Sequence, residues 1–147
     1  MPLVGAALGP GSIVLGAEAS DWEQAVRLAG DALVASGRTT AGYTDAMVQT
    51  IRDLGPYVVI APGLAMPHAR PSDSVLQTGM SLVLLRNPVS FGNSKNDPVR
   101  VVFALAALDH DRHLELLSEF AGYFSNEGFV NSLLSCSTES EIHSLFA

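Results

Sequence analysis

The sequence predicts an α/β fold: a single-domain sandwich over residues 1–147, with a mixed central sheet flanked by helices. The first observation is length, because 147 residues suffice for one domain with a proper core and fall short of two. The second is composition, since 48% of the residues are apolar and 16% are charged, as is typical of a globular chain. The third is the order of patterns, which runs from helices through strands to helices again.

The first part of the chain predicts a short strand and then a helix. Residues 12–15 have the composition of a short strand. Ser20 and Glu23 form a capping-box pair, so we expect a helix to start at Asp21. Gly37 is expected to end this helix. Its apolar face would carry Trp22, Val26, Ala29 and Leu33.

A second helix is expected over residues 42–54, where apolar residues recur at helical spacing. The Gly55-Pro56 pair should stop it, because proline cannot continue a helix and glycine tolerates the backbone geometry of a turn. Its buried face would carry Tyr43, Ala46, Met47 and Ile51.

The middle of the chain has the composition of a sheet. One strand is expected over residues 57–61, and residues 64–66 can continue it. A second is expected over 80–85. A third, over 100–108, is apolar at every residue after Arg100 and should be buried on both faces. The turn-rich segment 87–98 should join these last two strands as a surface loop.

The last part of the chain predicts helices. Asp109 or Asp111 can cap the first of them, and residues 128–134 form a short second one. Thr138 and Glu141 make a capping box before a third. The apolar stripe of the first helix would consist of Leu114, Leu117, Phe120, Ala121 and Phe124.

The charge balance argues against two classes of partner. The formal net charge is −7, which disfavours a nucleic acid or an anionic membrane surface as the main partner. A positively charged protein fits this balance better. The apolar segment at the N-terminus could pack on the domain or against another copy of the chain, so a homo-oligomer stays open.

The compartment is predicted to be the cytoplasm. Cys136 is the single cysteine, which excludes an intrachain disulfide and a cysteine-based zinc cage and suits a reducing environment. No Lys or Arg precedes Arg27, and glycine and proline interrupt the apolar N-terminus, so an export signal is not expected. No apolar stretch approaches the ~20 residues that span a bilayer.

One histidine, His68, has an unusual setting. Pro67 precedes it, Arg70 follows two residues later, and Met66 should be the last strand residue because proline favours extended geometry before it. A neutral imidazole just past a strand end is available as a nucleophile toward an anion such as phosphate. His68 could equally be a loop histidine without a role, and Arg70 either a surface cation or a group that steers an anion or an acidic partner.

A second group of histidines lies at the junction of a buried strand and a helix, in the segment 109–113. On a helix, His110 and His113 would share a face, and His113 has the register of the apolar residues that follow. One of these two histidines could reach across to His68. His110 is the better candidate for a position that faces solvent. A metal site with His68 is the alternative, but caps explain the neighbouring aspartates better.

The segment Ala65-Met-Pro-His-Ala-Arg70 resembles the phosphorylation motif of the type-2 enzyme IIA domains of the bacterial sugar phosphotransferase system (PTS), the mannitol/fructose superfamily. The similarity extends over about residues 10–147 and includes the strand 98–108 and the pattern His113-Leu-x-x-Leu117. Residues 54–63, Leu-Gly-Pro-Tyr-Val-Val-Ile-Ala-Pro-Gly, resemble the ascorbate-specific branch more narrowly.

This resemblance implies that His68 is phosphorylated and that His113 is a second active-site histidine. Phosphate would attach to Nε2 of His68, a backbone carbonyl would hold the other ring nitrogen, and Arg70 would lie at the rim. No metal or cofactor is implied. Members of the mannitol type carry an arginine where this chain has Thr50, and Arg52 lies two residues further on.

The resemblance implies that the protein is a phosphotransferase component with a phosphohistidine intermediate. It would act as a cytoplasmic phosphocarrier for ascorbate uptake. Phospho-HPr would be the donor, a cysteine of the IIB component the acceptor, and the membrane IIC component an indirect partner. A regulatory phosphocarrier of the same fold and a IIA for another sugar or polyol remain alternatives. A metal-dependent hydrolase using His68, His110 and His113 is a third, more distant hypothesis.

Overall fold

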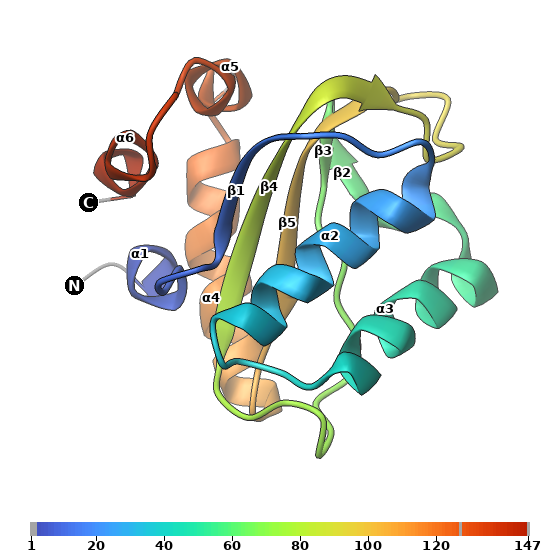
Figure 1. Cartoon of the computed structure of the whole chain (residues 1–147), viewed down its shortest axis with the longest axis vertical. Coiled ribbons are helices and arrows are strands. Elements are labelled where there is room, and N and C mark those ends of the chain that lie inside the picture. The colour runs from blue at the N-terminus through green and yellow to red at the C-terminus, as the bar shows by residue number, and fades with distance from the viewer. Residues whose placement is uncertain (1–2, 127, 147) are drawn as a thin grey trace.

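The computed structural model describes residues 3–126 and 128–146. Its centre is a five-stranded sheet with helices on both faces, which confirms the predicted α/β class (Figure 1). The strands are β1 (Ile13–Ala17), β2 (Val59–Ala61), β3 (Leu64–Ala65), β4 (Gly79–Val89) and β5 (Val99–Ala106). The helices are α1 (Leu3–Ala7), α2 (Trp22–Ala35), α3 (Ala41–Leu54), the 3-10 helix η1 (Pro56–Val58), α4 (His110–Phe124), α5 (Phe129–Leu134) and α6 (Glu139–Leu145).

The sheet is mixed, as predicted, with the strand order β1-β4-β5-β3-β2. The long strands β4 and β5 pair antiparallel at the centre, with Val83 opposite Val102. β1 runs parallel to β4, and β3 runs parallel to β5. β2 adds to β3 as an antiparallel edge. The carboxyl end of β3 therefore lies beside the central strand β5.

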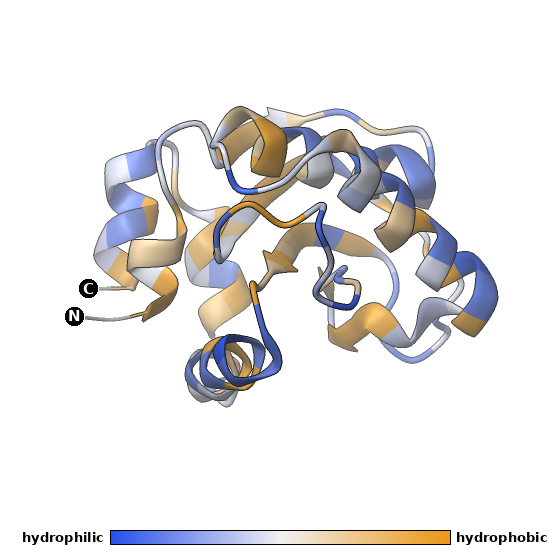
Figure 2. Ribbon diagram, turned by 90° about the horizontal axis from the view of Figure 1, so that it is seen from below, coloured by the Kyte–Doolittle hydropathy of each residue, from blue (hydrophilic) through white to orange (hydrophobic). Residues whose placement is uncertain are grey.

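Two apolar layers hold the helices against the sheet, because successive side chains of a strand point to opposite faces. On β4, Val83 and Leu85 belong to the layer under α2 and α3. Leu82 and Leu84 belong to the layer under α1, α4, α5 and α6. Figure 2 shows the hydrophobic strands in the middle and hydrophilic turns on the outer helices. Ser81, fully buried on β4, donates a hydrogen bond of 2.7 Å to the carbonyl of Ala29.

The helix caps correct one prediction and confirm another. Asp21 caps α2 by accepting a 2.9 Å hydrogen bond from the Gln24 amide, so the helix begins one residue later than the Ser20–Glu23 box predicted. Asp21 takes this place because its backbone is extended and its carboxylate reaches the third helical amide. At α6 the predicted capping box is present, and Thr138 accepts from the amide of Glu141.

The strands near His68 differ from the prediction. Tyr57 lies in η1 and not in a strand, because the proline at the start of η1 favours a tight helical turn. A turn at Gly63, whose φ is 78°, reverses the chain, so β3 pairs with β2 as a hairpin and does not continue it. β4 is longer than expected and takes in residues 87–89, which leaves 90–98 as the loop before β5.

The buried face of α4 was predicted incorrectly in part. Leu116 and Phe120 are the buried residues, whereas Leu114, expected in the stripe, is 50% exposed. Ala121 is exposed as well. The helix turns Leu116 toward the sheet because α1 packs on that side, and it leaves Leu114 on the side of His68.

The N-terminal apolar segment packs on the domain itself. Val4 and Leu8 are buried in the layer that contains α4. The carboxylate of Glu119 on α4 accepts hydrogen bonds from the amides of Leu3 (2.9 Å) and Val4 (2.5 Å). Within the described residues, no helix is both long and apolar enough to cross a bilayer.

Candidate active site

His68 lies where the chain leaves β3 and continues alongside β5. The amide of Leu105 on β5 donates a 3.0 Å hydrogen bond to the carbonyl of Pro67, and His68 and Leu105 form an isolated parallel bridge. β3 ends at Ala65, one residue earlier than predicted. The backbone of His68 is thus held by the central sheet although the residue lies outside a regular strand.

A buried tyrosine reinforces this position. The hydroxyl of Tyr43 on α3 donates to the carbonyl of Leu105 (2.5 Å) and accepts from the amide of Ala69 (3.0 Å). Burial raises the pKa of Tyr43 to about 12, so the hydroxyl keeps its proton at neutral pH. Tyr43 therefore ties α3, β5 and the segment after His68 to one another.

The ring of His68 is oriented by its own backbone. Nδ1 lies 3.0 Å from the carbonyl oxygen of Met66. Because a carbonyl only accepts hydrogen bonds, Nδ1 carries the proton in the neutral ring, and Nε2 is left with a lone pair. This geometry agrees with the prediction that a backbone carbonyl sets the tautomer.

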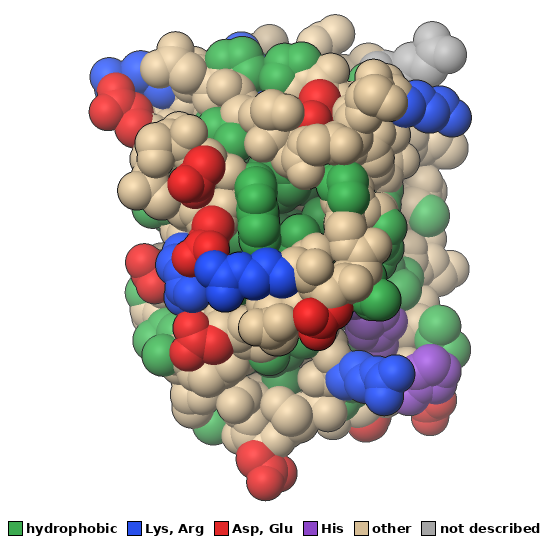
Figure 3. All heavy atoms as spheres, turned by 90° about the vertical axis from the view of Figure 1, so that its right-hand side faces the viewer, with side chains coloured by type: hydrophobic (Ala, Val, Ile, Leu, Met, Phe, Trp, Pro, Cys, Tyr) green, Lys and Arg blue, Asp and Glu red, His purple; other side chains and the backbone are tan. Residues whose placement is uncertain are grey.

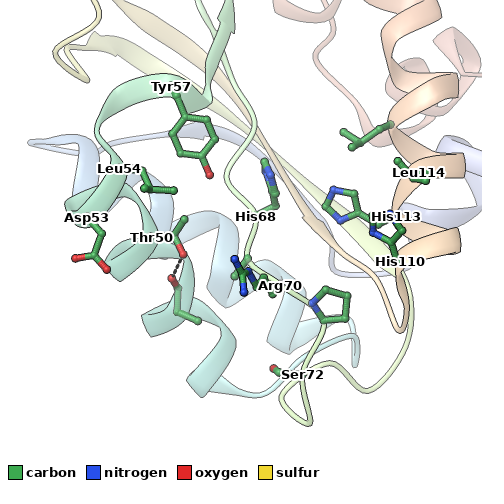
Figure 4. Close-up of a pocket in the computed structure, with 14 residues that line it drawn as sticks. Thr50, Asp53, Leu54, Tyr57, His68, Arg70, Ser72, His110, His113 and Leu114 are labelled. Atoms are coloured by element: carbon green, nitrogen blue, oxygen red, sulfur yellow. Dashed lines mark hydrogen bonds between the residues drawn. The ribbon is translucent and has the colours of Figure 1, made fainter.

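His113 is the histidine that lies beside His68. The two ring centroids are 5.2 Å apart, and the rings meet edge to face at 64° (Figure 4). Burial, followed by the nearby His68 and His110, lowers the pKa of His113 below its ordinary value. His110, at the start of α4, is exposed, as predicted.

A cavity of about 1010 Å³ surrounds the two histidines. Its walls come from α3, η1, the segment 68–72 and the first turns of α4. Exposed apolar side chains stand among its lining residues: Leu54 is 68% exposed, Tyr57 44% and Leu114 50%. The cavity is wide enough for a group larger than a phosphate to approach His68.

The basic residues near the cavity are distributed unevenly. Arg70, which is exposed, is the one Arg or Lys among its described lining residues. Thr50 also lines it, but its hydroxyl donates to the carbonyl of Ala46 at 2.8 Å (Figure 4). Arg52 turns away and pairs with Glu23 on α2. Figure 3 shows acidic and basic side chains spread over this face of the molecule, with histidines at its lower right edge beside a basic side chain.

The three histidines at the cavity are not arranged as a metal site. Among residues 3–126 and 128–146, no group of three or more His, Cys, Asp or Glu side chains could hold a metal ion. His68 and His113 are close to each other, but His110 is directed to solvent. The arrangement is that of two neighbouring imidazoles at the wall of one cavity.

Tyr57 is the site residue that the sequence reasoning missed. Its ring centroid lies 6.2 Å from that of His68, at an interplanar angle of 81°. The pattern of residues 57–61 predicted a strand that includes Tyr57. The preceding Gly55-Pro56 pair is typical of a turn, and it is the feature of the sequence that indicates η1 at this position. Burial raises the pKa of Tyr57 above its ordinary value.

Known proteins are similar to this chain in sequence and in fold. The model of the family "Phosphoenolpyruvate-dependent sugar phosphotransferase system, EIIA 2" matches residues 7–147. The ascorbate-specific PTS system EIIA component of Escherichia coli (strain K12) is 42% identical over 132 residues, which are 89% of this chain and 86% of that protein.

Two solved structures have the same fold. The solution structure of the mannitol-specific cryptic phosphotransferase enzyme IIA of Escherichia coli matches with a TM-score of 0.85 at 32% identity, covering 98% of each chain. In the complex of enzyme IIAMTL with phosphorylated enzyme IIBMTL, also from Escherichia coli, a chain matches with a TM-score of 0.82 at 28% identity, covering 95% of this chain and 96% of that one.

These findings confirm the resemblance inferred from the sequence around His68. The matched family spans both His68 and His113, and the 42% identical relative is ascorbate-specific. The chain therefore belongs to the EIIA 2 family of the phosphoenolpyruvate-dependent sugar phosphotransferase system and is a phosphocarrier of the EIIA type.

Proposed function

We propose that this chain accepts a phosphoryl group from phospho-HPr on Nε2 of His68 and passes it to a cysteine of a IIB component for ascorbate uptake. The membrane IIC component would be served indirectly, through IIB. The observation that carries the proposal is the 3.0 Å contact between Nδ1 of His68 and the Met66 carbonyl, which leaves Nε2 with its lone pair. The 42% identity to an ascorbate-specific EIIA component supports the choice of ascorbate.

In the first transfer, the lone pair on Nε2 of His68 attacks phosphorus. A new N–P bond forms while the N–P bond of the donor breaks, and the donor ring, protonated on its other nitrogen, leaves as neutral imidazole. The ring of His68 takes on the positive charge, and Nδ1–H continues to donate to the Met66 carbonyl. Because such transition states are stabilised chiefly by positioning and charge, this fixed ring orientation would favour the transfer.

In the second transfer, a cysteine thiolate of IIB attacks the same phosphorus. The N–P bond to His68 breaks, its electron pair returns to Nε2, and the neutral ring is restored with Nδ1 still protonated. No proton has to leave Nδ1 of His68 in either transfer, so its hydrogen bond to the Met66 carbonyl is kept. The reaction can therefore run repeatedly without rearranging the site.

His113 and Arg70 are proposed to stabilise the phosphoryl group. A phosphoryl group brings nearly two negative charges and three acceptor oxygens. The His113 ring, 5.2 Å from His68, is near enough to approach it, and Arg70 stands at the rim of the same cavity. The negative charge would raise the pKa of His113, and so favour its protonated, donating form.

Two observations support protein partners. Exposed apolar side chains, such as Leu54 and Leu114, stand at the cavity. The solved complex of IIAMTL with phosphorylated IIBMTL, one chain of which resembles this one, supports a IIB component as the acceptor. Both partners would reach His68 through the same wide cavity.

The first experiment tests the phosphorylated residue. Incubation with enzyme I, HPr and phosphoenolpyruvate should place an acid-labile phosphate on this chain, and His68→Gln should abolish it. His143→Gln, at an exposed histidine of α6, is the matched control and should be labelled like the wild type. Equal labelling of His68→Gln would overturn the proposal.

His113 is tested in the same system. His113→Ala should accept phosphate but transfer it to IIB at least tenfold more slowly, because one stabilising group is lost. Unchanged onward transfer would remove His113 from the mechanism.

The sugar is tested by presenting the phosphorylated wild type with an ascorbate-type IIB and with a mannitol-type IIB in separate reactions. Faster transfer to the mannitol type would contradict the ascorbate assignment.

A further inference from the structure

We infer that Tyr57 is a phosphate-binding residue of this site, whose hydroxyl donates a hydrogen bond to the phosphoryl group on His68. The inference rests on the proposed function, because it concerns the phosphorylated state of His68. It gives η1 a part in phosphoryl transfer. The strand expected over residues 57–61 did not suggest this part.

Tyr57 is placed on the side of His68 that His113 does not cover. Figure 4 shows Tyr57 and His113 on opposite sides of the His68 ring, with the tyrosine hydroxyl directed into the cavity. The ring centroids of Tyr57 and His68 are 6.2 Å apart, and the rings meet edge to face. A group attached to Nε2 of His68 would enter the cavity that both of these side chains line.

The three tyrosine hydroxyls of the chain differ in what they bind. Those of Tyr43 and Tyr123 donate to backbone carbonyls within the domain, of Leu105 and Phe146. The hydroxyl of Tyr57 makes no hydrogen bond to any described residue and lines the cavity. It is therefore a donor without a protein partner at the place where an anion would arrive.

Other donors on the same wall are already used. The hydroxyl of Thr50 donates to the carbonyl of Ala46, and Arg52 pairs with Glu23. Arg70 is exposed to solvent, which screens its charge. Tyr57 therefore offers the phosphoryl oxygens a hydroxyl donor in addition to His113 and Arg70.

Tyr57 is also suited to the task by its ionisation and its rigidity. Tyrosine ordinarily keeps its proton up to about pH 10, and burial raises the pKa of Tyr57 further. Pro56 precedes it in η1, and the side chains of Asn93 and Asn96 donate to the carbonyl of Val59 directly after η1, at 3.4 Å and 3.2 Å. The donor is held in place before phosphate arrives, which reduces the entropy lost on binding.

The experiment compares Tyr57→Phe with Tyr123→Phe, which removes a tyrosine hydroxyl far from the cavity. The equilibrium ratio of phosphorylated chain to phospho-HPr should fall about tenfold in Tyr57→Phe, the loss expected for one hydrogen bond to a charged group at a partly exposed site. Tyr123→Phe should keep the wild-type ratio. An unchanged ratio in Tyr57→Phe would overturn the inference.

A ³¹P titration provides a second readout, which a change in folding alone would not produce. A lost donor destabilises the dianion, so the pKa of the phosphoryl group on His68 should rise in Tyr57→Phe and stay unchanged in Tyr123→Phe. If the wild type carries no phosphate on His68, the proposed function itself fails. If His68 is labelled but both readouts of Tyr57→Phe equal the wild type, only the role of Tyr57 fails.

Discussion

At the scale of single residues, the site depends on two imidazoles that differ in their surroundings. His68 is oriented by the Met66 carbonyl at Nδ1. His113 is half-buried, and burial together with two neighbouring histidines lowers its pKa. A neutral His113 places no positive charge beside unmodified His68, which in the proposed function is the state before phosphoryl transfer. The same side chain can then take up a proton once a negative group is present.

The lowered pKa of His113 predicts a pH-dependent stability. Because His113 binds a proton less readily in the folded chain than in the unfolded chain, the free energy of unfolding should fall as pH drops below about 6.5. His113→Gln should flatten this dependence between about pH 7.5 and 5.5, measured by urea denaturation. The control His143→Gln should keep the wild-type slope, and equal slopes in all three proteins would contradict the prediction.

At the scale of elements, the loop between β4 and β5 supports η1 and the β2–β3 hairpin. The carboxylate of Asp97 accepts hydrogen bonds from Ser90 Oγ (2.9 Å) and from the amides of Phe91 (3.1 Å), Gly92 (2.8 Å) and Asn93 (3.0 Å). Burial acts to raise the pKa of Asp97, but these hydrogen bonds outweigh it and hold the pKa below its usual value. The loop they order then reaches across to the segment that carries Tyr57.

Asp97→Asn is expected to destabilise the domain by about 1–3 kcal/mol, the usual cost of losing hydrogen bonds to a charged acceptor. The wild-type advantage should be present above about pH 4 and disappear as pH falls through the lowered pKa of Asp97. Urea denaturation at pH 7 and pH 3 measures both effects. Asp31→Asn, at an exposed position of α2, should change stability by less than about 0.5 kcal/mol. Equal stability of Asp97→Asn and the wild type at pH 7 would show that the carboxylate does not order the loop.

At the scale of the whole molecule, helices close both faces of the sheet. α2 and α3 cover the face from which Tyr43 reaches the active-site backbone. α1 closes the other face beside α4, where Glu119 binds its first amides. The N-terminal segment therefore completes the core of its own domain, and the cavity with His68 and His113 is lined by α3 and α4.

This arrangement predicts that the N-terminal segment contributes to stability without taking part in phosphoryl transfer. Leu8 is 2% exposed. Replacing it by alanine should lower the free energy of unfolding by about 2–4 kcal/mol, because a cavity forms in the core. Leu3→Ala, at a residue 42% exposed, is the matched control and should cost well under half of that. Thermal and urea denaturation measure the loss, and the labelling of His68 should be unchanged at temperatures where the variant is folded. A Leu8→Ala protein as stable as the wild type would mean that the N-terminal segment does not close the core.

Local rules determined much of this protein from its sequence. The recurrence of apolar residues predicted the long helices and the buried central strands, because it acts within a few turns of helix or along one strand. Proline geometry singled out His68, since Pro67 restricts the chain immediately before it. The capping box at Thr138 was predictable for the same reason, because both partners lie within one turn.

Tertiary structure decided what local rules could not. His113 lies beside His68 because the chain passes through β4 and β5 before α4 begins, and the order of strands in the sheet brings the two segments together. Tyr57 faces His68 because η1 interrupts the expected strand, and Leu116 replaces Leu114 in the core because α1 packs on that side of α4. The sequence by itself determined the fold class and the central histidine, whose causes act over a few neighbouring residues. The neighbours of that histidine depend on contacts between segments distant in the chain, and those are set only when the sheet and its helices assemble.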